Sequence, residues 1–420
     1  MTGLGDALSY ITAQSFDSLM VLTAVVIVFE VPRYFGLFLL AILSPRPPKR
    51  PLEAAFRHKV SVILAGHNER DSVRRCIASM REQSRPPDEI VVFSDGSTDG
   101  MEKVLRELLE AGEIDRALWS DLRGGKSAGF NICQRMATGD ILINIDCDCS
   151  LDRDAFRRIV EPFEDPAVGS VAGNIQVRNA ASGLIATMQA IEYMITIALG
   201  KQGALAIDQV ICSSGGYSAF RKTALDSVGG CDAGGGEDLD VTMRLRARGW
   251  KIGFRIDSVC YTDVPDTFAG LVRQRFRWER DAVRLRFRKH RFNLNPFHPR
   301  FKLNEVLHHL EYLIFNILAA AIMPFYIIWL FATYGAFAFV ILLGLQVVLV
   351  LIDFPVFLLA AWLTPHVKAF RLIPYMFGFS VFNGFVMRFI RLAAYIDEWV
   401  FHSSFQDSYV PQKVHDIRSN

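Results

Sequence analysis

The chain has 420 residues, of which 51% are hydrophobic, with a mean hydropathy of +0.23 and a formal net charge of +2. The near-zero charge gives no general preference for nucleic acid, and the hydrophobic content is high for a soluble enzyme. All seven cysteines lie between residues 76 and 260, in a region that we expect to be cytosolic, so no disulfide framework is expected.

The first predicted element is a membrane helix over residues 20–43. This stretch is apolar for long enough to cross a bilayer, although Glu30, Pro32 and Arg33 interrupt it. A cleaved signal peptide is not expected, because its apolar core would be shorter and would follow a basic start. The next segment, 44–59, carries five basic residues against one acidic residue. By the positive-inside rule this segment lies in the cytoplasm, which leaves the N-terminus outside.

A soluble α/β domain is predicted on the cytosolic face at 59–262. Buried-strand patterns occupy 59–66, 89–100 and 140–152, and helical patterns occupy 67–83 and 101–112. This alternation predicts a mostly parallel sheet with helices on both faces, in which ligands bind beyond the carboxyl ends of the strands. The polar residues that follow those ends should converge on one cleft: His67, Asn68, Glu69, Asp95, Asp146 and Asp148. The glycine fingerprint of dinucleotide binding and the P-loop are absent from the sequence, which disfavours an NAD enzyme and an ordinary ATPase.

The segment INIDCDCS (143–150) alternates aspartate with cysteine and poses a choice between sulfur and oxygen ligands. Thiolate metal sites need cysteines paired across a turn with a distant partner pair, and no other cysteine pair in the sequence has that spacing. On a strand, Cys147 and Cys149 would point to one side and Asp146 and Asp148 to the other. We expect the cysteines to fill the core and the aspartates to suit a hard cation such as Mg²⁺ or Mn²⁺. An Asp-x-Asp pair also occurs by chance in solvated turns, so the pattern alone leaves both interpretations open.

A basic segment follows the α/β domain. Nine Lys and Arg residues from Arg273 to Arg291 are interleaved with aromatic residues. A nucleic-acid patch or a solvated helix would also explain this composition. Because membrane spans follow immediately, we expect an interfacial amphipathic helix whose spare arginines face anionic headgroups.

The C-terminal part of the chain is apolar again. Spans are predicted at 313–332 and 337–363, and a third stretch at 372–395 carries Arg388 and Arg391, so that it crosses or lies partly at the interface. The predicted division is a transmembrane helix and basic linker at 1–48, the α/β domain at 59–262, an interfacial segment at 263–300, two or three transmembrane helices at 301–400, and a polar tail at 401–420.

Five motifs occur in a fixed order along this framework: SDGSTDG (94–100), GGKSAGFN (124–131), NIDCDCS (144–150), GGGEDLD (234–240) and RQRFRWERD (273–281). The ordered set resembles the processive members of family 2 of the glycosyltransferases, the membrane synthases of cellulose, hyaluronan, chitin and chitin oligosaccharides. The resemblance implies a nucleotide-diphospho-sugar transferase fold (GT-A, Rossmann-like), α/β in class and inserted between transmembrane helices of the plasma (inner) membrane. Two departures are Ser94, where the family often has a first aspartate, and His67, where an aromatic residue is usual.

The resemblance also implies a role for each matched residue on the donor side. Asp95, helped by the turn from His67 to Glu69, would hold the uracil ring. Lys126 would offset the charge of the phosphates. Asp146 would contact the ribose, and Asp148 would bind the cation, Mg²⁺ or Mn²⁺.

On the acceptor side, Asp238 would be the general base and Glu237 would contact substrate beside it. These acids also suit the N-terminus of a helix, where the backbone dipole favours negative charge. Gln274, Arg275 and Arg277 would meet acceptor and diphosphate, and Trp278 would stack on the terminal sugar of the acceptor.

The expected function is inverting, processive polymerisation of UDP-glucose or UDP-N-acetylglucosamine, with export of the product. The expected partners are a UDP-sugar donor, a growing glycan acceptor and membrane lipid, with no nucleic acid; the sequence leaves open whether auxiliary subunits take part. A lipid glycosyltransferase that adds one sugar and a transporter with a nucleotide-binding domain are the alternatives. In the tail, Val410 to Lys413 resembles the second half of a loop that closes over the nucleotide in cellulose synthases, and a frayed terminus is the competing interpretation.

Overall fold

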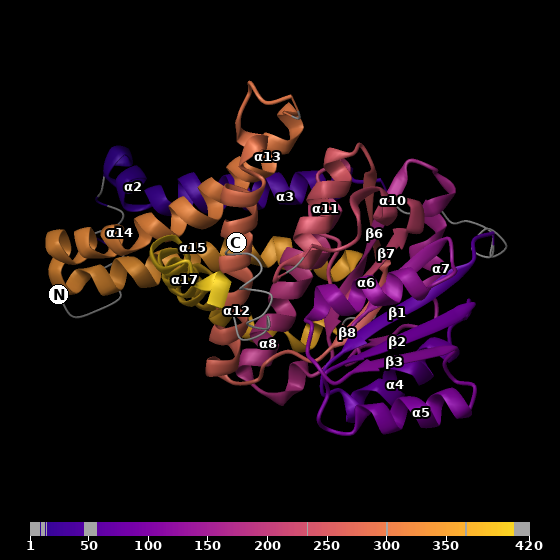
Figure 1. The fold of residues 1–420 in the computed structure, drawn as a ribbon. Helices are drawn as coiled ribbons and strands as arrows, with labels where there is room; N and C mark the ends of the chain where they lie inside the picture. Colours follow the sequence, from indigo (N-terminus) through magenta and orange to yellow (C-terminus); the bar gives the residue numbers. More distant parts are fainter. Residues whose placement is uncertain are drawn as a thin grey trace.

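The computed structural model describes residues 15–45, 57–232, 234–299, 301–365 and 368–406, together with Ser9 and Ala13. A helix-covered sheet and a bundle of long apolar helices form its two parts, with α12 (Phe268–Val283) between them (Figure 1). Most of the predicted basic linker, His366 in the connection between two spans, and the tail segment with Lys413 lie outside the described residues.

The sheet has eight strands in the order β3-β2-β1-β4-β7-β6-β8-β5. The strands are β1 (Val60–Gly66), β2 (Glu89–Asp95), β3 (Arg116–Ser120), β4 (Ile141–Ile145), β5 (Ser150–Leu151), β6 (Val168–Val177), β7 (Tyr217–Arg221) and β8 (Lys251–Thr262). Strands β3, β2, β1 and β4 are parallel, as the sequence predicts. Beyond β4 the sheet departs from the expected parallel arrangement, because β7 runs antiparallel to both β4 and β6. The loop that enters β7 therefore reaches the carboxyl end of β4.

Helices cover both faces of the sheet. On β1, Val62 and Leu64 pack into one core and Ile63 into the other, because successive side chains of a strand point to opposite faces. One core is closed by α4 (Arg70–Arg81), α5 (Met101–Glu110) and α7 (Ala155–Val160). The other is closed by α6 (Lys126–Met136), α10 (Lys222–Val228) and α11 (Glu237–Ala247). With both faces buried, the strand ends are the places where polar side chains reach a cleft.

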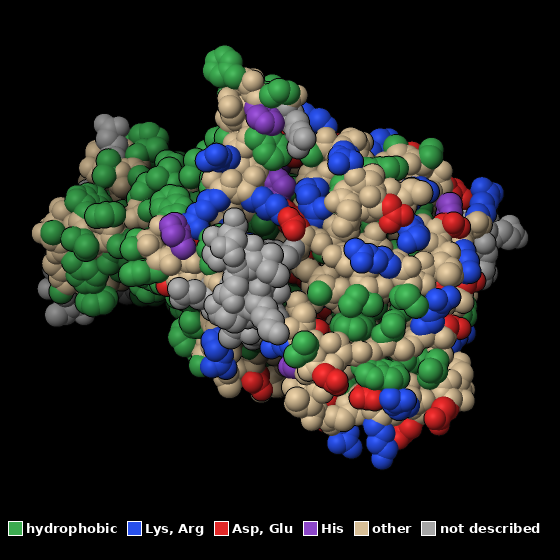
Figure 2. Space-filling model, viewed as in Figure 1, with side chains coloured by type: hydrophobic (Ala, Val, Ile, Leu, Met, Phe, Trp, Pro, Cys, Tyr) green, Lys and Arg blue, Asp and Glu red, His purple; other side chains and the backbone are tan. Residues whose placement is uncertain are grey.

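Within the part of the chain that the structure describes, three helices are long and apolar enough to cross a membrane: Val26–Leu43, Leu303–Leu363 and Ala369–Phe401. The second is divided at Gly335, whose φ of +54° lies in the left-handed region that favours glycine. Its two arms are α14 (Ala319–Tyr334) and α15 (Ala338–Leu363), and they coincide with the two predicted spans. The other helices of this part are α2 (Phe16–Leu22), α3 (Val31–Leu43), α13 (Leu303–Tyr312), α16 (Met376–Val381) and α17 (Met387–Phe401). Hydrophobic side chains gather over this part in Figure 2, whereas charged ones spread over the sheet domain.

A buried ionic group, here called the Glu192 cluster, joins the two parts; it comprises Glu192, Arg275, Glu279 and Arg391. Glu192 ends α8 (Leu184–Glu192), which continues through η5 (Tyr193–Leu199) into α9 (Gly200–Ala206). Its Oε2 lies 2.6 Å from Arg275 Nη2, and its Oε1 lies 3.9 Å from Arg391 Nη2. Arg391 Nε also lies 3.1 Å from Glu279 Oε1, so α8, α12 and α17 are held together.

Several other charged residues of the apolar helices and of the basic segment after α12 are also engaged by protein groups. Glu30 and Arg388, both expected within the membrane, pair with each other. Arg284 pairs with Asp281 at 2.8 Å, and the Arg286 guanidinium lies 4.2 Å from the centre of the Tyr312 ring. The expectation that spare arginines face lipid headgroups is therefore wrong for Arg284 and Arg286, which are buried. The pairing of Glu30 with Arg388 also weakens the transporter alternative, which dense unpaired charge would have favoured.

Candidate functional site

A cleft of about 450 Å³ opens beyond the carboxyl ends of β1, β2 and β4. Eight of the predicted site residues line it: His67, Glu69, Asp95, Lys126, Asp146, Asp148, Glu237 and Arg277. The structure thus brings the polar residues at the strand ends together in one cleft, which is the main geometric prediction from the sequence. Asp238, Gln274, Arg275 and Trp278 are not among the lining residues.

The turns after β1 and β2 are tied to each other and to the start of α6. Asp95 is 4% exposed, and its two carboxylate oxygens accept hydrogen bonds from the backbone amides of Gly124 and Gly125 at 2.6 and 2.7 Å. The Nδ1 of His67 lies 2.7 Å from the carbonyl oxygen of Asp95. These contacts fix the three loops before any ligand binds, so Asp95 is a rigid part of the wall.

Lys126 begins α6 and carries the positive charge at the centre of the cleft. Its Nζ lies 2.5 Å from Asp146 Oδ1 and 3.6 Å from Glu237 Oε1. Burial lowers the pKa of the Lys126 ammonium, but Asp146 and Glu237 outweigh burial and hold that pKa above its ordinary value. Burial raises the pKa of the Glu237 carboxyl, and the charge of Lys126 only partly offsets this. Lys126 is therefore a permanent cation on the cleft wall.

The segment that begins with Asp146 is a turn, not the strand end expected from the sequence. Strand β4 ends at Ile145, and the amide of Cys149 donates to the carbonyl of Asp146 at 3.1 Å. The separation of the side chains largely follows the prediction, since Cys147 and Cys149 are 2% and 1% exposed within the core while Asp146 and Asp148 line the cleft, although Cys147 also borders the cleft. Burial raises the pKa of the Cys147 thiol well above its ordinary value, so it stays protonated. The cysteines are core residues here.

Asp148 lies in a largely buried and negatively charged part of the cleft. Burial raises the pKa of its carboxyl, and the neighbouring charge of Asp146 raises it further. Burial also raises the pKa of Glu69 across the cleft, with Asp148 and Asp146 contributing. Among the described residues, no group of three or more His, Cys, Asp and Glu side chains is arranged to hold a metal. Two carboxylates still fit Mg²⁺ or Mn²⁺, because these ions commonly take most of their oxygens from substrate phosphates and water.

Asp238 does not line the cleft, but it lies beside Gly215, next to Lys126 and Glu237. Its Oδ2 accepts from the Gly215 amide at 2.9 Å, and its Oδ1 accepts from the Leu239 amide at 2.7 Å, at the start of α11. A Cβ on Gly215 would lie 3.1 Å from Lys126 Nζ and 3.2 Å from Glu237 Oε1. Only glycine lets the donor-side groups and Asp238 approach one backbone position so closely.

Residues 58–280 match the family described as glycosyltransferase-like family 2. This chain belongs to glycosyltransferase family 2. Poly-β-1,6-N-acetyl-D-glucosamine synthase of Staphylococcus aureus (strain MSSA476) is 30% identical over 223 residues, which cover 52% of this chain and 53% of that protein. The synthase of the same name from Staphylococcus epidermidis (strain RP62A) is 25% identical over 356 residues, covering 83% of this chain and 77% of that protein.

A solved structure of a mannosyltransferase from Pyrobaculum calidifontis, in complex with GDP-mannose and Mn²⁺, has the same fold. It superposes with a TM-score of 0.62 at 21% identity, over 90% of this chain and 99% of that one. The family and the GT-A fold expected from the sequence are thereby confirmed. The chain spans about half the length of the Staphylococcus aureus relatives that it matches.

The RQRFRW motif is where this family 2 domain differs most from expectation. Arg275 is 6% exposed, pairs with Glu192, and lies with its guanidinium carbon 4.5 Å from the centre of the Trp278 ring. The buried Oε1 of Gln274 has no hydrogen-bond partner among the described residues. Of the four predicted motif residues, only Arg277 lines the donor cleft.

Several residues in or beside the cleft were not singled out from the sequence. Arg123 lines the cleft, and Arg178, at the end of β6, donates to the Asp148 carbonyl at 2.9 Å. Lys201 on α9 donates to Ser214 at 2.5 Å, in the loop that carries Gly215. The adjacent glycines at 215–216 were the available signal, since a glycine pair before a strand often marks close backbone approach.

Proposed function

We propose that this chain is an inverting glycosyltransferase that polymerises UDP-N-acetylglucosamine into a β-linked polysaccharide and passes the product between its membrane helices. One observation carries the proposal: Lys126, Glu237 and Asp238 all approach Gly215, which brings the donor-side charges next to a carboxylate suited to proton removal. The printed name of the staphylococcal relatives, poly-β-1,6-N-acetyl-D-glucosamine synthase, supports the choice of sugar.

The donor binds in the cleft in this proposal. His67, Glu69 and Asp95 form the wall for uracil, and Asp146 contacts the ribose. A divalent cation, Mg²⁺ or Mn²⁺, held by Asp148 would neutralise the charge that builds on the diphosphate leaving group. Lys126 and Arg277 add positive charge on the same side of the cleft as the diphosphate. The ion pairs of Lys126 already hold its side chain in position, so binding of the diphosphate requires no reorganisation of this residue.

Proton removal occurs beside Gly215, next to the donor-side charges. Asp238 accepts the proton of an acceptor hydroxyl while the hydroxyl oxygen forms a bond to the anomeric carbon of the donor sugar. The bond from that carbon to the UDP oxygen breaks, and its electron pair leaves with UDP. A single displacement of this kind converts an α-linked donor into a β-linked product, with the glycan end held near Glu237, Gln274, Arg275 and Trp278.

The test is incubation of the purified full chain with UDP-N-acetylglucosamine or UDP-glucose and Mg²⁺ or Mn²⁺. We expect UDP release with UDP-N-acetylglucosamine and a product ladder many sugars long. Asp121→Asn, at an exposed aspartate outside the cleft, is the matched control for substitutions within it. A product limited to one added sugar would support the lipid glycosyltransferase alternative, and the absence of UDP release with either donor would overturn the proposal.

Topology is the second part of the proposal. The catalytic domain lies on the cytosolic side of the inner membrane, with the glycan and membrane lipid as partners. A cysteine at exposed Asp121, introduced after replacing partly exposed Cys212 with serine, should react with an impermeant thiol reagent only when the cytosolic face is open. Labelling from outside intact cells would contradict this orientation.

A further inference from the structure

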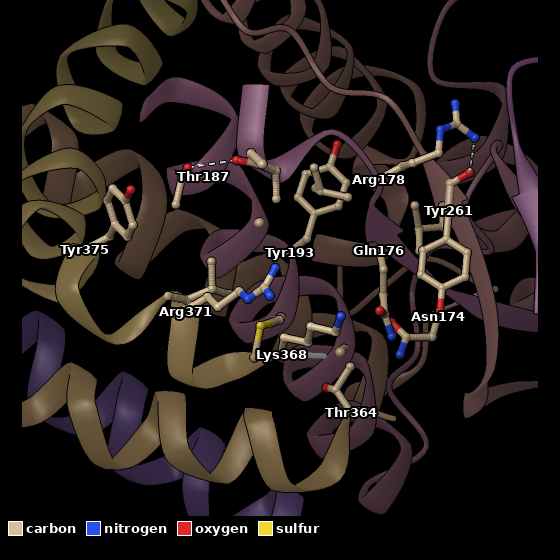
Figure 3. A pocket seen from close by; sticks show the side chains of 18 residues that line it. Asn174, Gln176, Arg178, Thr187, Tyr193, Tyr261, Thr364, Lys368, Arg371 and Tyr375 are labelled. Carbon is tan, nitrogen blue, oxygen red and sulfur yellow. Dashed lines mark hydrogen bonds between the residues drawn. The ribbon is translucent and has the colours of Figure 1, made fainter. Parts of the chain in front are cut away.

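A second cavity, of about 470 Å³, lies where the sheet domain meets the membrane helices (Figure 3). Its walls come from the carboxyl end of β6, from α8 and η5, and from the connection between α15 and α16. It shares no lining residue with the donor cleft. The connection joins two candidate spans, so this cavity lies at the level of the membrane surface.

The floor of the cavity contains buried polar atoms without partners. Asn174 is 0% exposed, and its Nδ2 donates to the Ile256 carbonyl at 2.8 Å, but its Oδ1 has no hydrogen-bond partner among the described residues. Thr364 is 4% exposed, and its Oγ1 also has no hydrogen-bond partner among the residues that the structure describes. A buried polar atom left unpaired is destabilising, and a ligand hydroxyl that bonds to it would remove that cost. The floor is therefore suited to a ligand that donates hydrogen bonds.

The mouth of the cavity is positively charged. Lys368 and Arg371 line it, are exposed, and have no ion-pair partner within the described ranges. Arg178 also lines the cavity, but its guanidinium pairs with Asp263 at 2.5 Å. The lining residues include no Asp or Glu. Two unpaired cations without a competing carboxylate favour an anion, and a phosphate offers the oxygens that both can bind.

The walls between mouth and floor are aromatic and apolar. Tyr193, Tyr261 and Tyr375 surround the space in Figure 3, and Met194 and Leu372 complete the lining. Such walls pack against the carbon skeleton of a polyol or a sugar, whose hydroxyls then reach Asn174.

We propose that this cavity binds a phosphate ester of a polyhydroxylated carbon skeleton, with the phosphate at Lys368 and Arg371 and the hydroxyls at Asn174 and Thr364. The site is separate from the donor cleft and does not depend on the reaction proposed above. The ligand has two sources of the same chemistry: the headgroup of an anionic phospholipid, such as phosphatidylglycerol, or a soluble polyol phosphate.

The test uses the purified full chain with UDP and Mn²⁺ saturating the donor cleft. In the soluble arm, binding of glycerol 1-phosphate and of methyl phosphate is measured by calorimetry. In the lipid arm, native mass spectrometry counts lipids retained after release from nanodiscs of phosphatidylcholine with and without phosphatidylglycerol. Saturable binding of glycerol 1-phosphate identifies a soluble ligand, and selective retention of phosphatidylglycerol identifies a lipid.

The variant K368Q/R371Q should weaken whichever ligand binds by about tenfold or more, because two charge-assisted contacts are lost. K103Q/R291Q, at two exposed cations away from the cavity, is the matched control and should change nothing. Thr364→Val preserves shape and should reduce the preference for glycerol 1-phosphate over methyl phosphate, or for phosphatidylglycerol over a lipid without headgroup hydroxyls. Equal binding by the wild type and K368Q/R371Q in both arms, or no binding in either, would overturn the proposal.

Discussion

The donor cleft and the RQRFRW helix are both rich in charge, yet they use it in opposite ways. In the cleft, the negative charges of Asp146 and Asp148 lie close together. Lys126 bonds to Asp146, and about a third of the Lys126 side chain remains exposed. On α12, Arg275 is buried and paired with Glu192. In the cleft, binding of a cation and a diphosphate still lowers the electrostatic free energy. On α12, the ion pair of Arg275 with Glu192 already stabilises the contact between two parts of the protein.

This difference teaches that residue type and motif order do not by themselves distinguish a binding group from a structural one. What distinguishes them here is whether the paired group keeps surface that a ligand can reach: the Lys126 side chain is 36% exposed, whereas Arg275 is 6% exposed. The four predictions below test this contrast.

The largest effect is expected at Asp238. Asp238→Asn should lower polymerisation about 100- to 10,000-fold, the usual contribution of a general base, because the amide cannot take the proton. Binding of UDP, measured by calorimetry, should be close to that of the wild type, since Asp238 lies outside the donor cleft. A residual rate within about tenfold of the wild type would remove Asp238 from the role of base.

The next effect concerns stability at the Glu192 cluster. Glu192→Gln leaves Arg275 without its carboxylate, whereas Arg391 keeps Glu279, and removing one partner of a buried ion pair typically costs about 3–5 kcal/mol. We expect a fall in Tm of roughly 6 °C or more in a thermal-unfolding scan. Arg277→Gln is the matched change on the same helix and should raise the KM for the UDP-sugar with little change in Tm. If Arg275→Gln behaved like Arg277→Gln, Arg275 would be a substrate ligand and the contrast would fail.

A smaller effect follows from the raised pKa values of Asp148 and Glu69. An acid whose pKa is higher in the folded than in the unfolded protein contributes stability below the unfolded pKa, and this contribution is lost as the pH rises through the folded pKa. The protein without cation should therefore lose stability as both acids ionise, and Mn²⁺ with UDP should restore it. The gain in Tm on adding Mn²⁺ and UDP should be larger near about pH 7.5 than near about pH 5. Asp148→Asn should abolish most of that difference, and an equal gain at both pH values in the wild type would contradict the assignment.

The smallest effect is expected for the cysteines beside these aspartates. Cys147→Ser and Cys149→Ser should each retain most of the metal-dependent turnover, within about threefold of the wild type, because both thiols lie in the core. Buried hydroxyls should lower the Tm slightly. Loss of turnover in a variant that remains folded would show that sulfur takes part in the metal site.

The sequence predicts the donor side of the site well because its signals are local. Buried strands such as β1 and β2 are visible as apolar runs, and parallel strands bring their ends together, so Asp95 and Asp148 could be placed without knowing their partners. The antiparallel entry of β7 depends on pairing with β4 some 70 residues away, and nothing local specifies it (Ile145 pairs with Tyr217). The partner of Arg275 is likewise 83 residues away, in a helix with no motif of its own.

The Glu192 cluster also constrains the order in which the protein is assembled. Glu192 leaves the ribosome first, Arg275 and Glu279 follow, and Arg391 emerges only after the helices around α14 and α15 have been synthesised. Until then, Arg275 is the one arginine of the cluster that can balance the two negative charges of Glu192 and Glu279. When α17 inserts in the correct orientation, Arg391 supplies the second positive charge. When α17 inserts in another orientation, Glu279 stays largely buried without Arg391, its partner. The ion pairs of this cluster are therefore complete only when the membrane helices and the catalytic domain have both assembled.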